Sequence, residues 1–439
     1  MSVSGQVGII AAVMVVAYAL TKWRKLSVEI SMLSAAVAGG LTGAIMKTPP
    51  LAQLARHLVE GAFTYLDVIL VFATATIFMA IVSESGGVNY VVRGTIKYFY
   101  NKRFIALILL MIIILIPGAL TGAGSVSLLV VGAPVALALS YLGISQKRVA
   151  AILFIVAGLS AVAPPVNIWA MIVSAGTAIP YVGFELPLGI PVLILGIFTM
   201  LVLGLKKEGS MNLEKALQDM PEVPERMSWW RVLLPFVAFF GLVIAFRIWP
   251  FSMPILGLPL EFSVAAVVAY GVSPIKIHAF SVSRDTVKRL LPLLATLVIV
   301  GMLQQIMTAT GVRGWLSFSV ISTPLILLYI SLALIIPASE GILTYGGAAI
   351  LGIPLIWFFD SIGLHATVAI AGLSLLWALG DGLPPTALIG RLSVIVSDYK
   401  DSYWSFLKST WLPWLVITIV AILIVVFSSR LEFLVRWSK

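Results

Sequence analysis

The chain has 439 residues, of which 61% are hydrophobic and only 10% are charged, and its formal net charge is +10. A soluble domain is about 45–50% apolar and about 25% charged, because a water-facing shell needs polar side chains. The composition therefore argues against a soluble enzyme and predicts an all-α polytopic membrane protein. Basic residues gather in the cytoplasmic loops of such proteins, so the positive charge is assigned to topology and no nucleic-acid partner is expected. The chain has no cysteine, which excludes disulfides and thiol catalysis.

Continuous apolar runs predict membrane spans along most of the chain. These runs cover residues 6–21, 28–46, 62–83, 187–205, 232–248, 259–272, 290–307 and 411–429. Between 104 and 180, and between 322 and 400, Gly, Pro and Ser interrupt the apolar pattern. The polar segment 206–231 predicts a cytoplasmic linker with a short amphipathic helix, capped by Asn212 and ended by Pro221.

The linker separates an N-terminal half, 1–205, from a C-terminal half, 232–439, and the halves are similar. The pairs Pro164-Pro165 and Pro384-Pro385 lie 220 residues apart. The same offset places Ile116-Pro117 on Ile336-Pro337, Gly132 on Gly352, Pro134 on Pro354, and Gly143 on Gly363. A gap-free register that matches Gly and Pro positions over about fifty residues predicts an internal repeat.

Charge then tests the orientation of the two halves. We place the N-terminus and the C-terminus outside and give each half a re-entrant hairpin, which enters and leaves the membrane on one side. Of the 28 basic residues, 21 then lie inside and 7 outside. This bias agrees with the positive-inside rule and predicts that the halves form an inverted repeat, an architecture typical of secondary transporters.

Two irregular segments recur in each half. The hairpin tips are expected at 117–127 and 337–347, and helix breaks at 160–167 and 380–386. Proline removes a helical hydrogen bond, so a Pro-Pro pair among small residues should unwind a helix. Freed carbonyl groups in a membrane bind a ligand or line a polar cavity. The alternative is that these segments are kinked helices that pack through Gly and Pro.

Polar groups in these segments are the candidate ligands, because helix N-termini suit carboxylates and exposed carbonyls suit Na⁺. Candidate substrate-binding residues are Thr121, Gly124, Ser125, Asn167, Ser339, Thr344, Thr386 and Arg391. Candidate Na⁺ ligands are Ser125, Ser127, Ala161, Pro164, Asn167, Glu340, Gly341, Gly380, Asp381 and Thr386.

The two acidic candidates, Glu340 and Asp381, lie in mid-membrane segments, where a carboxylate is costly and usually functional. They ligate a cation, carry a proton, or form a structural ion pair with Arg391. Arg391 itself faces an anionic substrate or extends to the cytoplasmic interface.

The tips and breaks resemble those of the ion transporter superfamily, and most closely those of the large membrane subunit of tripartite ATP-independent periplasmic (TRAP) transporters. The motifs that carry the resemblance are Phe78-Met-Ala-Ile-Val-Ser-Glu-Ser-Gly-Gly87, Thr121-Gly-Ala-Gly-Ser125, Ala163-Pro-Pro165 and Leu383-Pro-Pro385. Two positions differ from the family pattern. Val166 and Asn167 stand where a hydroxyl residue usually follows the first Pro-Pro, and Glu340 is not a feature of the family.

The resemblance implies an elevator-type transporter coupled to Na⁺, with a small organic anion such as a dicarboxylate as cargo. In TRAP systems a small membrane subunit and a periplasmic substrate-binding protein act as partners, and the location is a prokaryotic inner membrane. The alternatives are a stand-alone carboxylate symporter of the same superfamily and a proton-coupled antiporter. A homo-oligomer is compatible with each of these.

A remote alternative is an intramembrane aspartyl protease built on Asp381 and Asp360. An ATP-driven pump is not expected, because the sequence contains no Gly-x-x-x-x-Gly-Lys phosphate loop.

Overall fold

The computed structural model describes residues 3–46, 49–206, 208, 213–249, 252 and 256–436. Every regular element among these residues is helical. Nine helices in the described ranges are long and apolar enough to cross a membrane, or ten if the bent pair Tyr403–Ser409 and Trp411–Val426 forms one span. The chain is therefore a polytopic α-helical membrane protein, as its composition predicts.

The first half contains the helices α1 to α11. Their bounds are α1 Val3–Trp23, α2 Val28–Ile45, α3 Leu51–Ala62, α4 Leu66–Glu84, α5 Gly87–Phe99, α6 Arg103–Thr121, α7 Gly124–Ser127, the π-helix η1 Leu128–Gly132, α8 Ala133–Tyr141, α9 Gln146–Val162, α10 Ile168–Thr177 and α11 Glu185–Gly204. The linker helix is α12, Leu213–Asp219. It packs on the first half, with Ala216 and Met220 buried and the Asp219 carboxylate accepting a hydrogen bond from the Tyr141 hydroxyl.

The second half contains the helices α13 to α23. Their bounds are α13 Trp229–Ile248, α14 Gly257–Val272, α15 Ala279–Ala309, α16 Val312–Ile321, α17 Leu325–Leu343, the π-helix η2 Ala348–Gly352, α18 Ile353–Ser361, α19 Ala366–Gly380, α20 Leu388–Val396, α21 Tyr403–Ser409, α22 Trp411–Val426 and α23 Phe433–Arg436.

The expected spans correspond to α1, α2, α4, α11, α13, α14, α15 and α22. The helix α15 is much longer than the run 290–307, because its polar first turns contain no helix-breaking residue before Pro292. The predicted cap Asn212 lies outside the described residues, as do the basic residues Lys47, Lys207 and Lys439.

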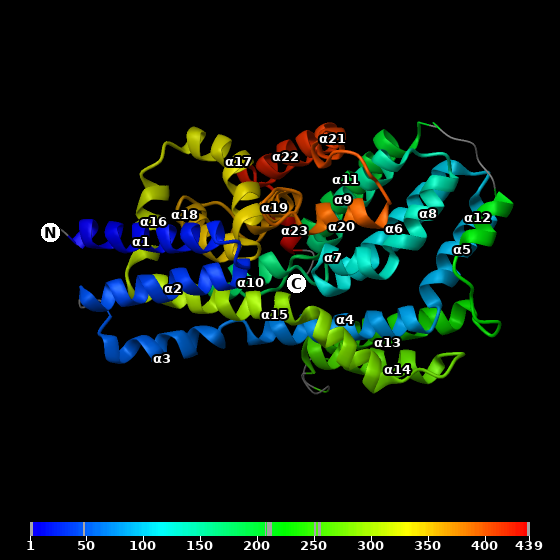
Figure 1. The fold of residues 1–439 in the computed structure, drawn as a ribbon, viewed down its shortest axis with the longest axis horizontal. Coiled ribbons are helices and arrows are strands. Elements are labelled where there is room, and N and C mark those ends of the chain that lie inside the picture. The colour runs from blue at the N-terminus through cyan, green and yellow to red at the C-terminus, as the bar shows by residue number, and fades with distance from the viewer. Residues whose placement is uncertain are drawn as a thin grey trace.

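The helices form two groups, which we call the outer layer and the hairpin body. The outer layer is α1 to α4 with α13 to α15. The hairpin body is α6 to α11 with α17 to α22. Figure 1 shows most of the outer layer along the lower edge of the molecule and the hairpin body above it. The short helices α5 and α16 join the two groups, and they lie toward opposite ends of the view.

Element bounds recur at the offset that the sequence predicts. The helix α8 begins at Ala133 and α18 at Ile353, and the π-helices η1 and η2 precede them in the same register, 220 residues apart. The peptide bonds Pro164-Pro165 and Pro384-Pro385 are both cis. The joining helices α5 and α16 both follow a glycine with positive φ, Gly86 at 83° and Gly311 at 79°.

The outer layer depends on a close helix crossing of α3 and α15 at Gly61 and Gly301. A Cβ atom at Gly61 would lie 2.6 Å from Met302 Cα and 2.7 Å from the Gly301 carbonyl oxygen. These neighbours are backbone atoms, which cannot move aside as a flexible side chain can.

We expect Gly61→Ala to destabilise the protein by about 1–3 kcal/mol, because the added methyl group separates the two backbones. The measurement is thermal unfolding of the purified protein in detergent. The matched control is Gly241→Ala on α13, where no atom lies within 4 Å of the added methyl group. Equal stability of the two variants would contradict the crossing.

Candidate functional site

The first hairpin is formed by α6 and the returning segment α7, η1 and α8. The helix α6 ends at Gly122, whose φ of 71° lets the chain reverse without a Cβ clash. The Ser127 hydroxyl donates to the carbonyl of Ile114, and the Arg103 guanidinium donates to that of Leu142. These bonds join the arms of the hairpin near its tip and at its open end, so its two ends lie side by side.

The second hairpin repeats this arrangement with α17, η2 and α18. Its turn begins at Thr344, which has a φ of 53°. A Cβ atom at Gly347 would lie 2.5 Å from Ser339 Oγ, so the returning arm passes directly over the end of α17. Farther from the tip, the rings of Tyr329 and Phe359 lie 6.1 Å apart.

In the first half the hairpin tip contacts the helix break. The Val166 N–H, just after the Pro-Pro pair, donates to the Ala119 carbonyl at 3.0 Å. The approach is close because Gly118 has no side chain: a Cβ atom there would lie 1.8 Å from Ser160 Oγ. The tip thus satisfies a backbone donor that the break leaves free.

The second half forms the corresponding contact. Thr386 follows the second Pro-Pro pair, and it donates to the Gly341 carbonyl through its N–H at 3.1 Å and its Oγ1 at 2.9 Å. A Cβ atom at Gly380 would lie 2.4 Å from the Pro337 carbonyl oxygen and 2.5 Å from Glu340 Cβ. Each break therefore packs directly against the tip of its own half.

The two halves also exchange contacts. A Cβ atom at Gly124 in the first tip would lie 2.6 Å from Ile389 Cδ1 of α20, the helix after the second break. Conversely, Trp169 of α10, the helix after the first break, packs against Tyr345 of the second tip, with ring centroids 5.8 Å apart. Each tip thus meets its own break and the helix that follows the opposite one.

Two carboxylates lie at the second tip and break. Glu340 is 1% exposed and Asp381 is 6% exposed. They interact electrostatically with each other and with the phenol of Tyr345. Glu340 Oε2 forms no well-aligned hydrogen bond, and the Glu340 carboxyl group interacts with the side chain of Trp169. A buried carboxylate that is not paired with a cationic group needs a cation or a proton to offset its charge.

Arg391 does not provide that charge, since no ion pair joins it to Glu340 or Asp381 among the described residues. It is exposed, and its guanidinium donates to the Pro385 carbonyl at 2.8 Å. Among the described residues, the structural ion pair between Arg391 and Glu340 or Asp381, which the sequence allowed as one alternative, is not formed. Arg391 stabilises the second break through a freed carbonyl group.

Most of the candidate hydroxyl groups donate to backbone carbonyls. Thr121 donates to Pro117, Ser127 to Ile114, Ser339 to Ile336, Thr344 to Leu343 and Thr386 to Gly341. Their lone pairs remain available to a cation. Ser125 and Gly124 are buried in the first tip, and Ala161 and Pro164 lie buried and half-buried at the first break.

Asn167 is fully buried and bridges the first break. Its Oδ1 accepts from the Ala170 N–H at 3.0 Å, which caps α10, and its Nδ2 donates to the Val162 carbonyl at the end of α9. The Tyr181 hydroxyl accepts from the Asn167 N–H and donates to the Pro165 carbonyl. Asn167 thus joins the two half-helices, and one lone pair of its Oδ1 remains for a ligand.

Any cation at the second site would be held by oxygen atoms alone. Among the described residues, no group of three or more His, Cys, Asp and Glu side chains could hold a metal ion. Two carboxylates with nearby hydroxyl and carbonyl oxygens suit a hard cation.

Two aromatic residues of this site, Trp169 and Tyr345, were not among the sequence candidates. The indole nitrogen of Trp169 is buried, and the Trp169 side chain interacts with the Glu340 carboxyl group. Tyr345 follows Thr344 in the predicted tip, and it occupies the position that Ser125 has in the first half at the 220-residue offset. This match to the candidate Ser125 was the sequence signal that could have identified Tyr345 as a site residue.

Comparison with models of known protein families gives no match, and comparison with curated proteins also gives none.

We expect Thr386→Val to cost only about 1 kcal/mol, because the backbone N–H bond to Gly341 survives when the hydroxyl bond is lost. The first half already carries valine, Val166, at the corresponding position. Gly341→Ala should cost more, since the added methyl group would lie 2.8 Å from Leu383 Cβ and 3.0 Å from the Leu383 carbonyl oxygen. Thermal unfolding in detergent measures both variants, and the reverse order of stability would contradict the tip–break contact.

Proposed function

We propose that this chain is a secondary active transporter that couples the movement of a cation to the uptake of a small organic anion. The observation that carries the proposal is the pair of buried carboxylates, Glu340 and Asp381, placed where a hairpin tip meets a broken helix. In membranes, buried ionisable groups beside unwound backbone mark ion and substrate pathways.

The recurring elements support an inverted-repeat architecture. Two hairpins, two breaks and two Gly-initiated joining helices recur in order, and the joining helices lie toward opposite ends of the molecule (Figure 1). In the proposal the hairpin body moves past the outer layer as an elevator and carries the cargo between the tips. The cargo is a carboxylate or dicarboxylate, whose charge suits the N-termini of the half-helices α10 and α20.

Na⁺ is the coupling ion in the main proposal. The alternative is a proton, which would satisfy the buried Glu340 Oε2 as well as a cation would. The aspartyl protease interpretation is not favoured, because Asp381 is buried beside Glu340 whereas Asp360 is exposed on α18.

In biological terms we propose the large permease subunit of a TRAP system in a prokaryotic inner membrane, with both termini outside. A small membrane subunit and a periplasmic binding protein are its proposed partners. A stand-alone symporter of the ion transporter superfamily, alone or as a homo-oligomer, is the second candidate, because all the features above lie within this one chain.

Na⁺ should stabilise the purified protein relative to choline at equal ionic strength, by about 2.7 kcal/mol at one hundred times the dissociation constant. Glu340→Gln and Asp381→Asn should lose most of this stabilisation, because each removes a negative charge from the site. The exposed Asp360→Asn is the matched control and should keep it. Thermal unfolding at a series of Na⁺ concentrations is the measurement.

Uptake by proteoliposomes then separates the two coupling ions. Accumulation of a radiolabelled mono- or dicarboxylate should follow an imposed Na⁺ gradient and decrease at least tenfold in both variants. Uptake that does not depend on Na⁺ but increases with an imposed pH gradient would indicate that the proton is the coupling ion. Unchanged stability and unchanged uptake in both variants would refute a coupling role for the two carboxylates.

The inverted repeat predicts that the open ends of the two hairpins face opposite sides of the membrane. The chain has no native cysteine, so single-cysteine variants can be labelled without background. Gln146→Cys follows the first hairpin and Ser361→Cys ends the second, and both positions are exposed. An impermeant maleimide should label Gln146→Cys only from the cytoplasmic side and Ser361→Cys only from the outside. Labelling of both from one side would exclude the inverted topology.

A further inference from the structure

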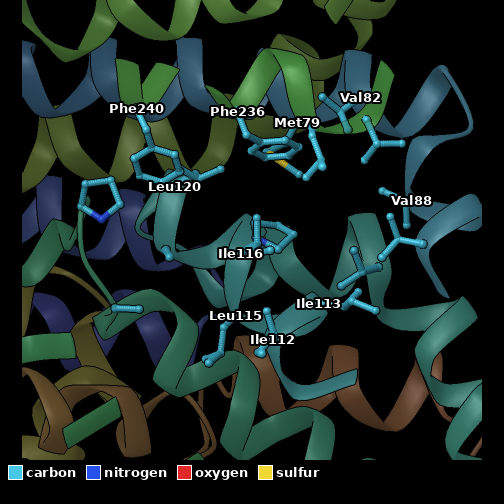
Figure 2. Close-up of a pocket in the computed structure, with 18 of the residues that line it drawn as sticks. Met79, Val82, Val88, Ile112, Ile113, Leu115, Ile116, Leu120, Phe236 and Phe240 are labelled. Atoms are coloured by element: carbon cyan, nitrogen blue, oxygen red, sulfur yellow. The ribbon is translucent and has the colours of Figure 1, made fainter. Parts of the chain in front are cut away.

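A large cavity separates the outer layer from the hairpin body. Its volume is about 480 Å³. The helices α4, α5 and α13 form one wall, while α6, α11 and the first break form the other. Figure 2 shows Phe240, Phe236, Met79 and Val82 along the first wall, opposite Ile112, Ile113, Leu115 and Ile116 of α6.

The lining consists of aliphatic and aromatic residues with glycine and proline, and Trp229 is the one lining residue with a polar side-chain atom. Ordered water needs two to four polar partners, which such a wall does not offer. An empty cavity of this size would forfeit the dispersion contacts of all its lining atoms. The cavity therefore suits an apolar occupant, and it does not suit a small anion.

The cavity is accessible from the lipid phase. Several lining side chains are also exposed on the surface of the described structure: Ile112, Ile116, Leu193, Leu233 and Phe240 are each 38–53% exposed. In a membrane these residues face hydrocarbon, so an acyl chain can enter sideways without crossing a polar surface.

Aromatic and basic residues mark one end of the cavity as lying at headgroup depth. Trp229 packs against Tyr90 of α5, with ring centroids 5.2 Å apart. The guanidinium of Arg231 lies 5.2 Å from the ring centroid of Trp230 and forms no ion pair with a described acidic residue. Arg231 does not line the cavity itself; it lines a small neighbouring pocket that shares Val82 and Val232 with the cavity wall. Trp and Tyr favour the membrane interface, and Arg binds phosphate groups well.

The volume limits what the occupant can be. On the same scale of cavity volumes, an apolar cavity of about 150 Å³ holds one benzene ring, so this cavity has room for about three times as many carbon atoms. This matches one acyl chain.

We propose that the cavity binds one acyl chain of a membrane phospholipid, with the lipid phosphate at Arg231. The chain lies between the outer layer and the hairpin body. It contacts Pro164 and Pro165 of the first break and Ala119, whose carbonyl accepts the Val166 N–H. This site is separate from the carboxylates of the second half and does not depend on the proposed transport function.

A photoreactive phosphatidylglycerol with a diazirine near the end of one acyl chain tests the site. The protein is reconstituted with this lipid in nanodiscs, illuminated and mapped by mass spectrometry. We expect crosslinks concentrated in residues 112–120 and 232–240, several-fold above those on the exposed face of α1. Labelling no stronger than on α1 would overturn the proposal.

Gly189→Leu should lower the cavity crosslinks several-fold by filling the space. A Cβ atom at Gly189 of α11 meets only Pro164, at 3.5 Å, which is an ordinary contact. The matched control is Gly241→Leu on α13, where no atom lies within 4 Å of the added Cβ, and it should leave the crosslinks unchanged. Equal labelling of both variants would exclude the cavity as the lipid site.

Arg231→Gln tests the phosphate contact without changing the cavity. It should lower crosslinking by the phospholipid at least threefold, while Arg226→Gln, an exposed linker residue, should not. A diazirine fatty acid, which lacks the phosphate, should label the cavity less and show no response to Arg231→Gln. If the fatty acid labels as strongly as the phospholipid, the assignment to phospholipid is wrong.

Discussion

The structure depends on one constraint: inside a bilayer, every backbone N–H and carbonyl group needs a partner within the protein. Where the two helices are broken, backbone groups lose their helical hydrogen-bond partners, and in each half the hairpin tip supplies a new partner. The Val166 N–H bonds to the Ala119 carbonyl, and the Thr386 N–H bonds to the Gly341 carbonyl. Such bonds require the tip backbone to touch the break, so positions such as Gly118 and Gly380 cannot carry a side chain. Unwound backbone at membrane depth is tolerated only where protein covers it, so the polar groups of each break lie where the tip packs against it.

The same frame carries different chemistry in the two halves. In the first half Ser160 of the break faces Gly118 of the tip, whereas in the second Glu340 of the tip faces Gly380 of the break. Asp381 follows Gly380, and its counterpart after Ser160 is Ala161. Both halves thus offer backbone oxygens, but only the second adds carboxylates. A cation bound at the second site would be held by charge, and one at the first by dipoles alone.

The sequence predicted the apolar helices, because long apolar runs act locally. The Gly-Pro patterns lie next to the helix ends at Thr121, Val162, Leu343 and Gly380. The sequence did not predict the registers at the tips. At the 220-residue offset Ala119 matches Ser339. The carbonyl that accepts the tip–break hydrogen bond is nevertheless that of Ala119 in the first half and that of Gly341 in the second, because α17 begins and ends 222 residues after α6. Trp169 and Tyr345 were missed for another reason. Their burial depends on contacts between the halves, which no periodicity within either half reveals.

The exchange of contacts between the halves bears on how the proposed transporter moves. Because α10 contacts the second tip and α20 the first, the hairpin body cannot separate along the boundary between the halves. Arg313 also ties α16 to the body: it donates to the Gly176 carbonyl at 2.7 Å and lies 4.1 Å from the Trp357 ring centroid. Gly86 and Gly311, where α5 and α16 leave the outer layer, have positive φ angles that glycine adopts without strain, and they are the candidate hinges of the proposed movement. A rigid body hinged at these two points would move as a unit past α4 and α13, along the apolar cavity between the two groups of helices.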